Sequence, residues 1–390
     1  MSPFWITKAF FSGFVLAAIN SMMSPPGNRL APVAFSEIEG WRSDNHAAAL
    51  LAFRDSCAAI LGEARGFERP VLFGGNKSHW TAVCETAQTA RDPRAFFEAN
   101  FVALRVIDPD RPEGLFTGYY EPEAQGSRTK SGAYQVPIYR TPNDLVAFDE
   151  HQEAIAGYKY GRLIYGIPQP YFTRREIEEG ALDGRGLEIA WLKNWADAFF
   201  IHVQGSGRIR LPDGALLRLA FGAKSGRPYA GIGGLLVERG AFSREDMSMQ
   251  ATRSWMAANE RAARSLMWEN QSFIFFREID VPDENLGPPG AQHVSLTPQR
   301  SLAVDRSLWL FGTPVWLDTA APAAADGAMQ SFRHLLIAQD TGTAIRGAAR
   351  GDVFWGAGAD AAWTAGHMKS PGTMIVLLPH ALAKMLLASQ

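Results

Sequence analysis

The part of the chain after residue 280 consists of short apolar segments separated by turn-forming residues. Each segment is three to five residues long, and Gly, Pro and Asp lie between them. The segments are Val294–Leu296, Val315–Leu317, His334–Ala338, Val353–Trp355 and Met374–Leu378. Runs this short are typical of strands rather than helices. With 37 Gly and 23 Pro spread along its 390 residues, the chain is predicted to be a turn-rich β protein rather than a helical bundle.

The region from 45 to 105 shows a helical pattern instead. Apolar residues recur every three to four positions after Ser43 and Asp44, which predicts a first helix. Asp92 followed by Pro93 predicts the start of a second helix. The apolar faces consist of Leu50, Phe53, Cys57, Ile60 and Leu61 in the first helix and Phe96, Phe97 and Phe101 in the second. A chain of this length has material for two or three domains.

The middle of the chain alternates between the two patterns. The aromatic, turn-rich segment 116–122 is predicted to be loop and strand. A capping box from Thr173 to Glu176 predicts a helix that ends at Gly180. Alternating residues over 199–204, a Gly-Ser-Gly turn and a second run over 208–211 predict a β-hairpin.

Three further segments lie between residues 231 and 327. Ser243 is predicted to open a long helix. The Gly-Ile-Gly-Gly segment 231–234 lacks the spacing of a dinucleotide-binding motif and is interpreted as a loop. The Ala-rich stretch 319–327 is interpreted as a surface loop. One face of the long helix would contain Met247, Ala251, Trp255 and Ala258.

The N-terminus and the cysteines indicate an exported protein. Lys8 precedes an apolar stretch of eleven residues, 9–19, followed by turn formers, and this pattern predicts a signal peptide over 1–30. The alternative is an ordinary buried N-terminal segment. Cys57 and Cys84 suit a disulfide in an oxidising compartment, although two buried thiols fit the same pattern.

The charge and the histidines exclude several classes of function. Lys and Arg total 38 and Asp and Glu total 40, so the net charge of −2 does not favour an electrostatic nucleic-acid clamp. The 8 histidines are scattered, and no C-x-x-C or H-E-x-x-H pattern occurs in the sequence. We therefore expect neither a metal site nor an organic cofactor.

The most informative local pattern for chemistry is the apolar strand His334–Ala338, which leads to Asp340 on a tight Gly turn. A carboxyl group where a buried strand meets a cleft loses hydration, and the resulting rise in its pKa lets it serve as a protonated general acid. The structural alternative is that Asp340 caps the turn through its side chain. Asp352 is a second carboxylate nearby, either a helper or a structural hydrogen-bonding group.

The Asp-Thr-Gly sequence at 340–342 also matches the aspartic-protease signature. That chemistry needs two carboxylates that share a proton across a pseudo-twofold axis. The sequence contains a single Asp-Thr-Gly and no evident duplicated lobe, which excludes this class. The segment 204–207 does not have the Gly-x-Ser-x-Gly spacing of a serine hydrolase either.

Taken together, seven stretches resemble the membrane-bound lytic murein transglycosylase A family. They are 116–122, 199–208, 287–291, 296–298, 300–305, 338–347 and 352–356. The resemblance covers about residues 35–380, and its last blocks resemble the family's Asp-rich C-terminal 3D domain. It implies a mainly β fold with some α, in which a double-psi β-barrel domain is assembled from 35–124 and 280–390. A smaller β-barrel-like domain would be inserted at 125–279, with a cleft between the two domains.

The resemblance also implies an activity. The family cleaves the β-1,4 bond between N-acetylmuramic acid and N-acetylglucosamine in peptidoglycan and leaves a 1,6-anhydro end. Asp340 occupies the matching catalytic position, as general acid and then base. One carboxyl group suffices for this reaction, because the C6 hydroxyl of the sugar replaces both water and an enzyme nucleophile. A hydrolytic glycosidase that pairs Asp340 with Asp352 or Glu121, and a non-catalytic wall-binding protein, are the alternatives.

The expected ligands and location follow from the same resemblance. Glycan strands of peptidoglycan are the expected partner, proteins of wall synthesis or division are candidates, and we expect a monomer. The family's name implies a lipid anchor, but the first cysteine is Cys57, so no lipobox cysteine follows the apolar stretch. We therefore expect a periplasmic protein that is soluble or is held only by an uncleaved signal helix. Arg346 would hold either Asp352 or a substrate oxygen. The candidate substrate-binding residues are Tyr119, Tyr120, Gln204, Ser206, Gly207, Arg346 and Asp352.

Overall fold

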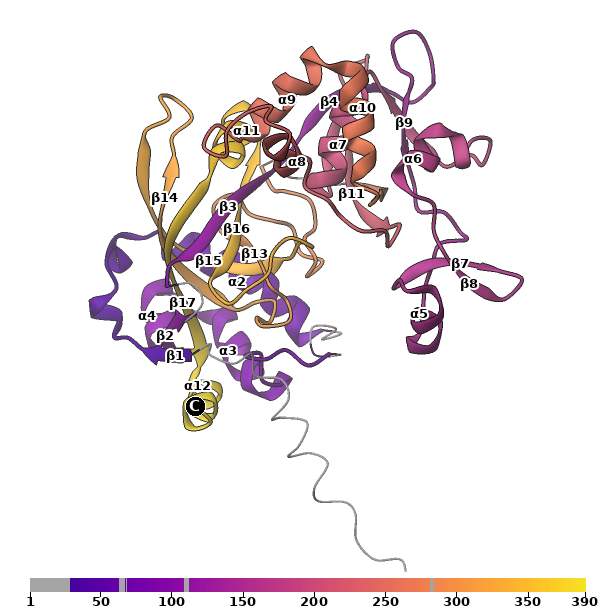
Figure 1. Ribbon diagram of the computed structural model, residues 1–390. Helices are drawn as coiled ribbons and strands as arrows, with labels where there is room; N and C mark the ends of the chain where they lie inside the picture. The colour runs from indigo at the N-terminus through magenta and orange to yellow at the C-terminus, as the bar shows by residue number, and fades with distance from the viewer. Residues whose placement is uncertain (1–28, 63–66, 68, 109–111, 281–282, 284) are drawn as a thin grey trace, which may run out of the picture.

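Three β-sheets organise the chain in the computed structural model, which describes residues 29–390 except 63–66, 68, 109–111, 281–282 and 284. The signal peptide predicted over 1–30 therefore lies outside the described residues, apart from its last two positions. Figure 1 shows the N-terminal helices and the C-terminal strands together in one body, with the middle of the chain beside it. The fold is a mixed α/β architecture.

The largest sheet has eight strands from both ends of the chain. Its order is β1-β2-β17-β14-β15-β13-β16-β3, and β17 pairs with β3 as well as with β14. The six strands β17, β14, β15, β13, β16 and β3 therefore close into a ring. The strands are β1 (Arg29–Pro32), β2 (Phe101–Ile107), β3 (Gly114–Glu121), β13 (Ser301–Val304), β14 (Pro314–Pro322), β15 (Met329–Asp340), β16 (Arg350–Ala357) and β17 (Lys369–Pro379).

These strands confirm four of the five segments predicted after residue 280. The exception is Val294–Leu296, where Ser295 forms only an isolated bridge with Pro289. The Ala-rich surface loop predicted over 319–327 is also wrong in its first part, because β14 continues to Pro322 and pairs with β15 along its whole length. Small side chains such as Ala are compatible with a loop and with a strand, so pairing with β15 decides that this segment is a strand.

Helices of the N-terminal region cover the ring and confirm the helical pattern there. They are α2 (His46–Leu61), α3 (Lys77–Thr89) and α4 (Pro93–Asn100), with the short η1 (Phe35–Glu37) and η2 (Trp41–Ser43) before them. Asp92 caps α4 as predicted, by accepting from the Ala95 amide at 3.0 Å. Phe101 falls outside the helix and begins β2. Cys57 and Cys84 join α2 to α3 through a disulfide, which confirms that interpretation.

Two helices accompany the C-terminal strands. They are α11 (Ala359–His367) and α12 (His380–Ala388). The core beneath this body is dominated by large side chains that are at most 1% exposed: Trp41, Phe53, Trp80, Trp309 and Trp316. Every helix among the described residues is too short or too polar to cross a lipid bilayer.

The middle of the chain builds a six-stranded and a three-stranded sheet. The larger has the order β12-β11-β10-β4-β9-β5, and the smaller is β6-β7-β8. The strands are β4 (Glu123–Ser127), β5 (Val136–Tyr139), β6 (Val146–Ala147), β7 (Tyr160–Ile164), β8 (Ile167–Pro170), β9 (Glu188–Leu192), β10 (Gly207–Arg210), β11 (Leu216–Lys224) and β12 (Ile274–Ile279). The helices are α5 (Glu150–Ala156), α6 (Arg174–Glu176), η4 (Ile177–Ala181), α7 (Trp195–Gln204), α8 (Ile232–Glu238), α9 (Met249–Ala258) and α10 (Glu260–Glu269).

The hairpin predicted over 199–211 is wrong in its first half. Residues 195–204 form helix α7, which begins at the capping residue Asn194 and ends at Gly205 with a left-handed φ of 75°. Phe199, Phe200 and Ile201 are all buried, so the segment has apolar residues on nearly every side and its alternation carries no information. The second half is a strand, β10, which pairs with β11.

Two other predictions in this region need correction. The long helix starts at Ser248, which caps α9, whereas Ser243 closes a local turn by accepting from the Asp246 amide. The predicted loop 231–234 contains the start of α8, because Gly231 is its N-cap residue. The capping box at Thr173 and Glu176 is confirmed and opens α6, which passes into the η4 turn.

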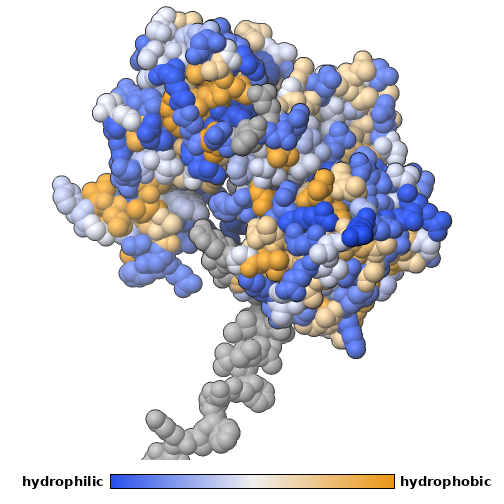
Figure 2. All heavy atoms as spheres, turned by 180° about the vertical axis from the view of Figure 1, so that it is seen from behind, coloured by the Kyte–Doolittle hydropathy of each residue, from blue (hydrophilic) through white to orange (hydrophobic). Residues whose placement is uncertain are grey.

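The three-stranded sheet and α5 project from the rest of the molecule. At the tip of the β7–β8 hairpin, Tyr165 has a φ of 52° and is fully exposed. Figure 2, seen from behind, shows apolar side chains gathered on this projecting part. The exposed apolar residues there are Ile155, Leu163, Ile164, Tyr165 and Ile167.

Candidate active site

A cavity of about 330 Å³ lies between the closed ring and the six-stranded sheet. The ring contributes the ends of β3, β15 and β16, and the middle of the chain contributes α7, the end of β11 and the segment before β12. The polar residues that line it are Tyr119, Arg174, His202, Gln204, Lys224, Tyr229, Asn270, Ser272, Asp340, Thr341, Thr343 and Asp352. The cavity thus brings together residues far apart in the sequence.

Asp340 is the last residue of β15, and its carboxyl group faces this cavity. Its Oδ1 accepts from the backbone amides of Ala291 and Thr341, both at 2.9 Å. Its Oδ2 accepts from the Tyr119 hydroxyl at 2.9 Å. Burial raises the pKa of Asp340 above its usual value, although the three hydrogen bonds act in the opposite direction and the nearby Asp352 adds to the rise.

Gly290 lets the backbone approach Asp340 this closely. A Cβ atom at this position would lie 2.6 Å from the Gln339 carbonyl oxygen and 3.3 Å from the Asp340 Cβ. The next residue is Ala291, whose amide donates to Asp340. Gln339 is itself fixed, because its side chain accepts from Ser301 and donates to the Ala52 carbonyl and to Ser56. The loop and strand that hold Asp340 are therefore tightly packed.

Asp352 lies on β16 in the same cavity. Its Oδ1 accepts from the hydroxyl of Thr117, and Thr117 in turn accepts from Arg350 at 2.8 Å. Burial raises the pKa of Asp352, while the charge of Arg350 and the bond from Thr117 lower it. The arrangement gives Asp352 a structural hydrogen bond and also an electrostatic effect on Asp340.

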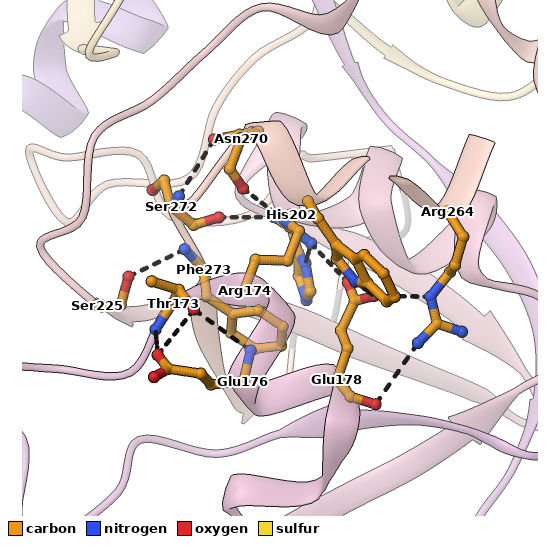
Figure 3. A network of polar contacts seen from close by, with 11 residues as sticks. Thr173, Arg174, Glu176, Glu178, His202, Ser225, Arg264, Asn270, Ser272 and Phe273 are labelled. Carbon is orange, nitrogen blue, oxygen red and sulfur yellow. Dashed lines mark hydrogen bonds and ion pairs between the residues drawn. The ribbon is translucent and has the colours of Figure 1, made fainter. Parts of the chain in front are cut away.

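Arg174 forms the opposite wall of the cavity and is 1% exposed. It donates to the carbonyl oxygens of Asn270 at 3.0 Å and Ser272 at 2.7 Å, and it pairs with Glu178 at 3.3 Å. Figure 3 shows Arg174 within this network, with Arg264 bound to the same glutamate at 3.0 Å. A buried arginine held by fixed acceptors makes this wall rigid.

His202 of α7 lies against Arg174 and also lines the cavity. The ring nitrogen Nδ1 is 2.9 Å from the Arg174 guanidinium, which can only donate, so Nδ1 accepts and the proton resides on Nε2. Burial and the charge of Arg174 hold the pKa of His202 well below its usual value. The imidazole is therefore neutral, and its ring stacks on Phe276 with centroids 5.5 Å apart.

The structure separates the predicted substrate-binding residues into two groups. Tyr119, Gln204 and Asp352 line the Asp340 cavity. Tyr120 lines an adjoining cavity of about 200 Å³ that shares Gln204 with the first, and the Gln204 side chain accepts from the Tyr120 amide at 3.2 Å. Ser206 is 6% exposed.

The other three predicted residues lie outside the lining of these two cavities. Ser206 and Gly207 do not border either of these two cavities. Arg346 pairs with Asp305 at 3.3 Å, which differs from a contact with Asp352, one of its two predicted roles. Its side chain is 61% exposed at the outer edge of the site.

Arg174, Lys224 and Asn270 line the cavity from the middle of the chain, although no local sequence pattern marks them as site residues. Arg174 was visible only as the residue after a helix cap, and Lys224 only as the end of a strand. His202 belongs to the stretch 199–208 that resembles the family, but the sequence pattern predicts a strand there, whereas the residue lies in helix α7. Among the described residues, no group of three His, Cys, Asp or Glu side chains is arranged to hold a metal ion.

Comparison with known proteins identifies the family. The family model described as the MltA specific insert domain matches residues 115–277, and the 3D domain matches residues 300–378. Membrane-bound lytic murein transglycosylase A of Vibrio cholerae serotype O1 is 34% identical over 286 residues, which cover 72% of this chain and 70% of that protein. The chain belongs to the membrane-bound lytic murein transglycosylase A family. It is therefore a lytic transglycosylase, an enzyme of the lyase class, as the sequence predicted.

Further relatives agree with this family. Membrane-bound lytic murein transglycosylase A of Escherichia coli strain K12 is 32% identical and covers 79% of this chain and 78% of its own length. The crystal structure of the membrane-bound lytic murein transglycosylase from Agrobacterium tumefaciens has a TM-score of 0.82 and 36% identity, covering 92% of this chain and 99% of that one. The structure of E. coli MltA with bound chitohexaose has a TM-score of 0.64 and 28% identity, and the match covers 90% of this chain and 91% of that one.

Proposed function

We propose that this transglycosylase binds glycan strands of peptidoglycan between the ring and the six-stranded sheet and cleaves the β-1,4 bond after N-acetylmuramic acid without adding water. The observation that carries the proposal is the environment of Asp340, a carboxyl group with a raised pKa in a cavity between two sheets. The similarity to E. coli MltA, which was solved with bound chitohexaose, supports a glycan as the ligand.

The first step assigns the proton to one oxygen of Asp340. Two backbone amides already donate to Oδ1, so the proton of the neutral acid resides on Oδ2. Tyr119, whose hydroxyl lies 2.9 Å from Oδ2, then rotates its own O–H away, so that its oxygen accepts the hydrogen bond from protonated Oδ2 until the glycosidic oxygen of the substrate takes its place. Protonated Oδ2 donates to the glycosidic oxygen, and the bond to the leaving sugar breaks.

The second step uses the same residue as a base. The carboxylate formed on Asp340 accepts the proton of the C6 hydroxyl, while that oxygen bonds to the anomeric carbon and closes the 1,6-anhydro ring. No water enters and no covalent bond to the enzyme forms, so a second catalytic carboxylate is unnecessary. The amides of Ala291 and Thr341 stabilise the carboxylate between the two steps.

Other residues of the cleft have supporting roles in this proposal. Tyr119 and Gln204 would contact sugar units near the cleaved bond, and Tyr120 is proposed to act through the adjoining cavity. Asp352 would hold the pKa of Asp340 high by its negative charge. For Ser206 and Gly207, burial and the start of β10 support a role in shaping the turn after α7.

A hydrolytic reaction is the second candidate, because Asp352 lies in the same cavity as Asp340. Glu121 is a poor partner for it. Glu121 is fully buried and paired with Arg208 at 2.8 Å and Arg218 at 2.7 Å. These two arginines hold it where β3 of the ring passes into β4 of the neighbouring sheet, so its carboxylate has a structural role.

We also propose the domain division and location. A domain of residues 35–124 and 280–390, with the double-psi β-barrel form of the family, would carry an inserted domain of residues 125–279. The passage from β3 to β4 at 121–123 and the end of β12 at Ile279 support these boundaries. We propose a periplasmic monomer, in keeping with a substrate in the cell wall.

The experiment that tests the proposed function is the turnover of Asp340→Asn on purified peptidoglycan. Loss of general acid–base catalysis should lower kcat by about 10²- to 10⁴-fold, while binding of the glycan is retained in a sedimentation assay. Wild-type turnover by a folded Asp340→Asn protein would overturn the role of Asp340.

A further inference from the structure

Five positively charged residues extend outward from the Asp340 cavity and form what we call the cationic rim. Lys224 lines the cavity at the end of β11, and the other four residues are exposed and do not line it. The rim consists of Arg69, Lys159, Lys224, Arg306 and Arg346. The charges of Arg306, Arg346 and Lys159 all act on Lys224, and those of Arg69 and Arg346 act on Arg306. Each of the other residues is therefore within electrostatic range of Lys224 or Arg306.

Packing contacts bring these residues together. A Cβ atom on Gly226 would lie 2.8 Å from the Tyr160 carbonyl oxygen, so the start of β7, which follows Lys159, packs on the chain just after Lys224. The Leu72 amide donates to the Ser307 carbonyl at 3.0 Å and holds the segment after Arg69 beside the turn at Arg306. Asp305 accepts from the Gly347 amide at 3.0 Å and from Arg346, which joins that turn to the loop after Asp340.

The positive charge of the rim is largely uncompensated. Arg346 pairs with Asp305, and its side chain remains 61% exposed. Within the part of the chain that the structure describes, Arg69, Lys159, Lys224 and Arg306 form no ion pair. Lys224 instead lies with its Nζ 5.9 Å from the ring centroid of Tyr160. Like charges at this density repel each other and attract anions, even though the net charge of the whole chain is −2.

We propose that the cationic rim binds the carboxylates of the peptide that branches from N-acetylmuramic acid, so that the enzyme recognises the stem peptide together with the glycan. This inference rests on the proposed function. The sugar units offer only neutral hydroxyls and acetamides, whereas the stem peptide carries several carboxylates in sequence. The rim begins at Lys224 beside the cleavage site and continues outward to Arg306 and Lys159, which fits an anionic chain leaving the glycan.

Two sources of carboxylate must be distinguished. A glycan strand stripped of its peptides by an amidase has a free lactyl carboxylate on each N-acetylmuramic acid, whereas in an intact strand this group is an amide and the carboxylates lie further out. Recognition of the lactyl group would need one cation near the sugar. Recognition of the peptide uses the outer residues Arg306 and Lys159, which do not line the cavity.

The test compares kcat/KM on peptide-bearing and on stripped glycan strands for the wild type, Lys224→Gln, Arg306→Gln and the double variant. The control is Arg42→Gln, which removes one positive charge, as each single variant does, from an exposed residue of η2 away from the cleft. The measured quantity is the ratio of kcat/KM on peptide-bearing strands to kcat/KM on stripped strands. We expect this ratio to fall by about tenfold in the double variant and to remain at the wild-type value in the control. Added salt should lower the wild-type ratio and leave that of the double variant nearly constant.

The possible results distinguish a failure of stem-peptide recognition from a failure of the proposed function. A ratio within twofold of the wild type in the double variant would overturn stem-peptide recognition, and so would an equal loss on both substrates, which would indicate the lactyl carboxylate or the glycan. If the double variant does not fold, Arg306→Gln alone decides, because this side chain is exposed. Failure of the wild type to release fragments from either substrate would instead overturn the proposed function.

Discussion

The hydroxyl of Tyr119 donates to Oδ2 of Asp340 at 2.9 Å, although the two residues are 221 positions apart in the sequence. The contact joins β3 to the end of β15, two strands that are not neighbours in the ring. Tyr119 is held in turn by Phe354, with ring centroids 5.2 Å apart. The phenol thus lies where it can control both the position and the ionisation of the proposed acid.

Tyr119 and Asp352 should move the pH dependence of the reaction in opposite directions. A reaction that needs protonated Asp340 slows as the pH rises through the pKa of this group. The Tyr119 hydrogen bond lowers this pKa and the Asp352 charge raises it. Tyr119→Phe should therefore shift the descending limb of kcat/KM to higher pH, and Asp352→Asn should shift it to lower pH.

Full pH profiles of kcat/KM for the three proteins measure this prediction. If the descending limb shifts in the same direction in Tyr119→Phe and Asp352→Asn, or does not shift in either, then the limb reflects the titration of a group other than Asp340. A simple loss of structure in either variant would lower the rate at every pH and leave the limb in place, so the profile separates the two effects.

Replacement of Gly290 should damage the site more than the fold. In Gly290→Ala the new methyl group would lie 2.6 Å from the Gln339 carbonyl oxygen, which forces the loop and the Ala291 amide away from Asp340. We expect kcat to fall about tenfold or more, since one donor to a catalytic carboxylate is lost. Gly234→Ala is the control, because a Cβ there meets nothing within 4 Å. Equal activity of the two variants would contradict this account.

The disulfide should contribute to stability and not to catalysis. Cys57 and Cys84 are 27 residues apart and join α2 to α3, and neither of them lines the cavity. Closing a loop of this length stabilises a protein by about 3–4 kcal/mol in the chain-entropy model. The double variant Cys57→Ala/Cys84→Ala should lose about this free energy of unfolding in urea and keep its kcat. A reducing agent should destabilise the wild type and have no effect on the variant.

Asp44 should contribute stability that acid removes. Burial alone would raise its pKa, but bonds from His334 and from Arg300, both carried by the C-terminal part of the chain, hold the pKa far below its usual value. Because this pKa is lower in the folded than in the unfolded protein, the ionised carboxylate stabilises the fold at pH values above the unfolded-state pKa of about 3.9. This contribution is lost as the pH falls from there through the folded-state pKa. Asp44→Asn should cost about 3 kcal/mol at pH 7.

Urea unfolding at neutral and at acid pH measures this effect. The stability difference between the wild type and Asp44→Asn should narrow at acid pH, because the wild type then loses the ionic contribution that the variant lacks. A difference that is constant with pH would assign the loss to packing rather than to charge.

The position of Asp340, at the end of a buried strand that borders a cavity, could be predicted because the signal is local. An apolar strand that ends in a carboxylate on a Gly turn shows both the burial and the position of this group within nine residues, 334–342. Four of the five strand segments after residue 280 were predicted correctly for the same reason. Asp92 and Thr173 were predictable as caps because capping depends on neighbours in the chain.

The opposite wall of the cavity could not be predicted in this way. Arg174 and His202 meet because α7 is a helix, and its apolar sequence fits helix and strand equally well until the surrounding residues bury it. Lys224 reaches the cavity only through the pairing of β11 with β10 and β12. Such contacts depend on the packing of distant segments, for which one sequence carries no periodic signal.

The most direct test of the central claim is the mass of the products when the wild type digests purified peptidoglycan in water enriched with oxygen-18. Attack by the C6 hydroxyl predicts 1,6-anhydro products that are one water lighter than hydrolytic ones and carry no label. Labelled products of the full hydrolytic mass would show that water attacks the anomeric carbon, and would contradict the account of Asp340 as the single acid and base.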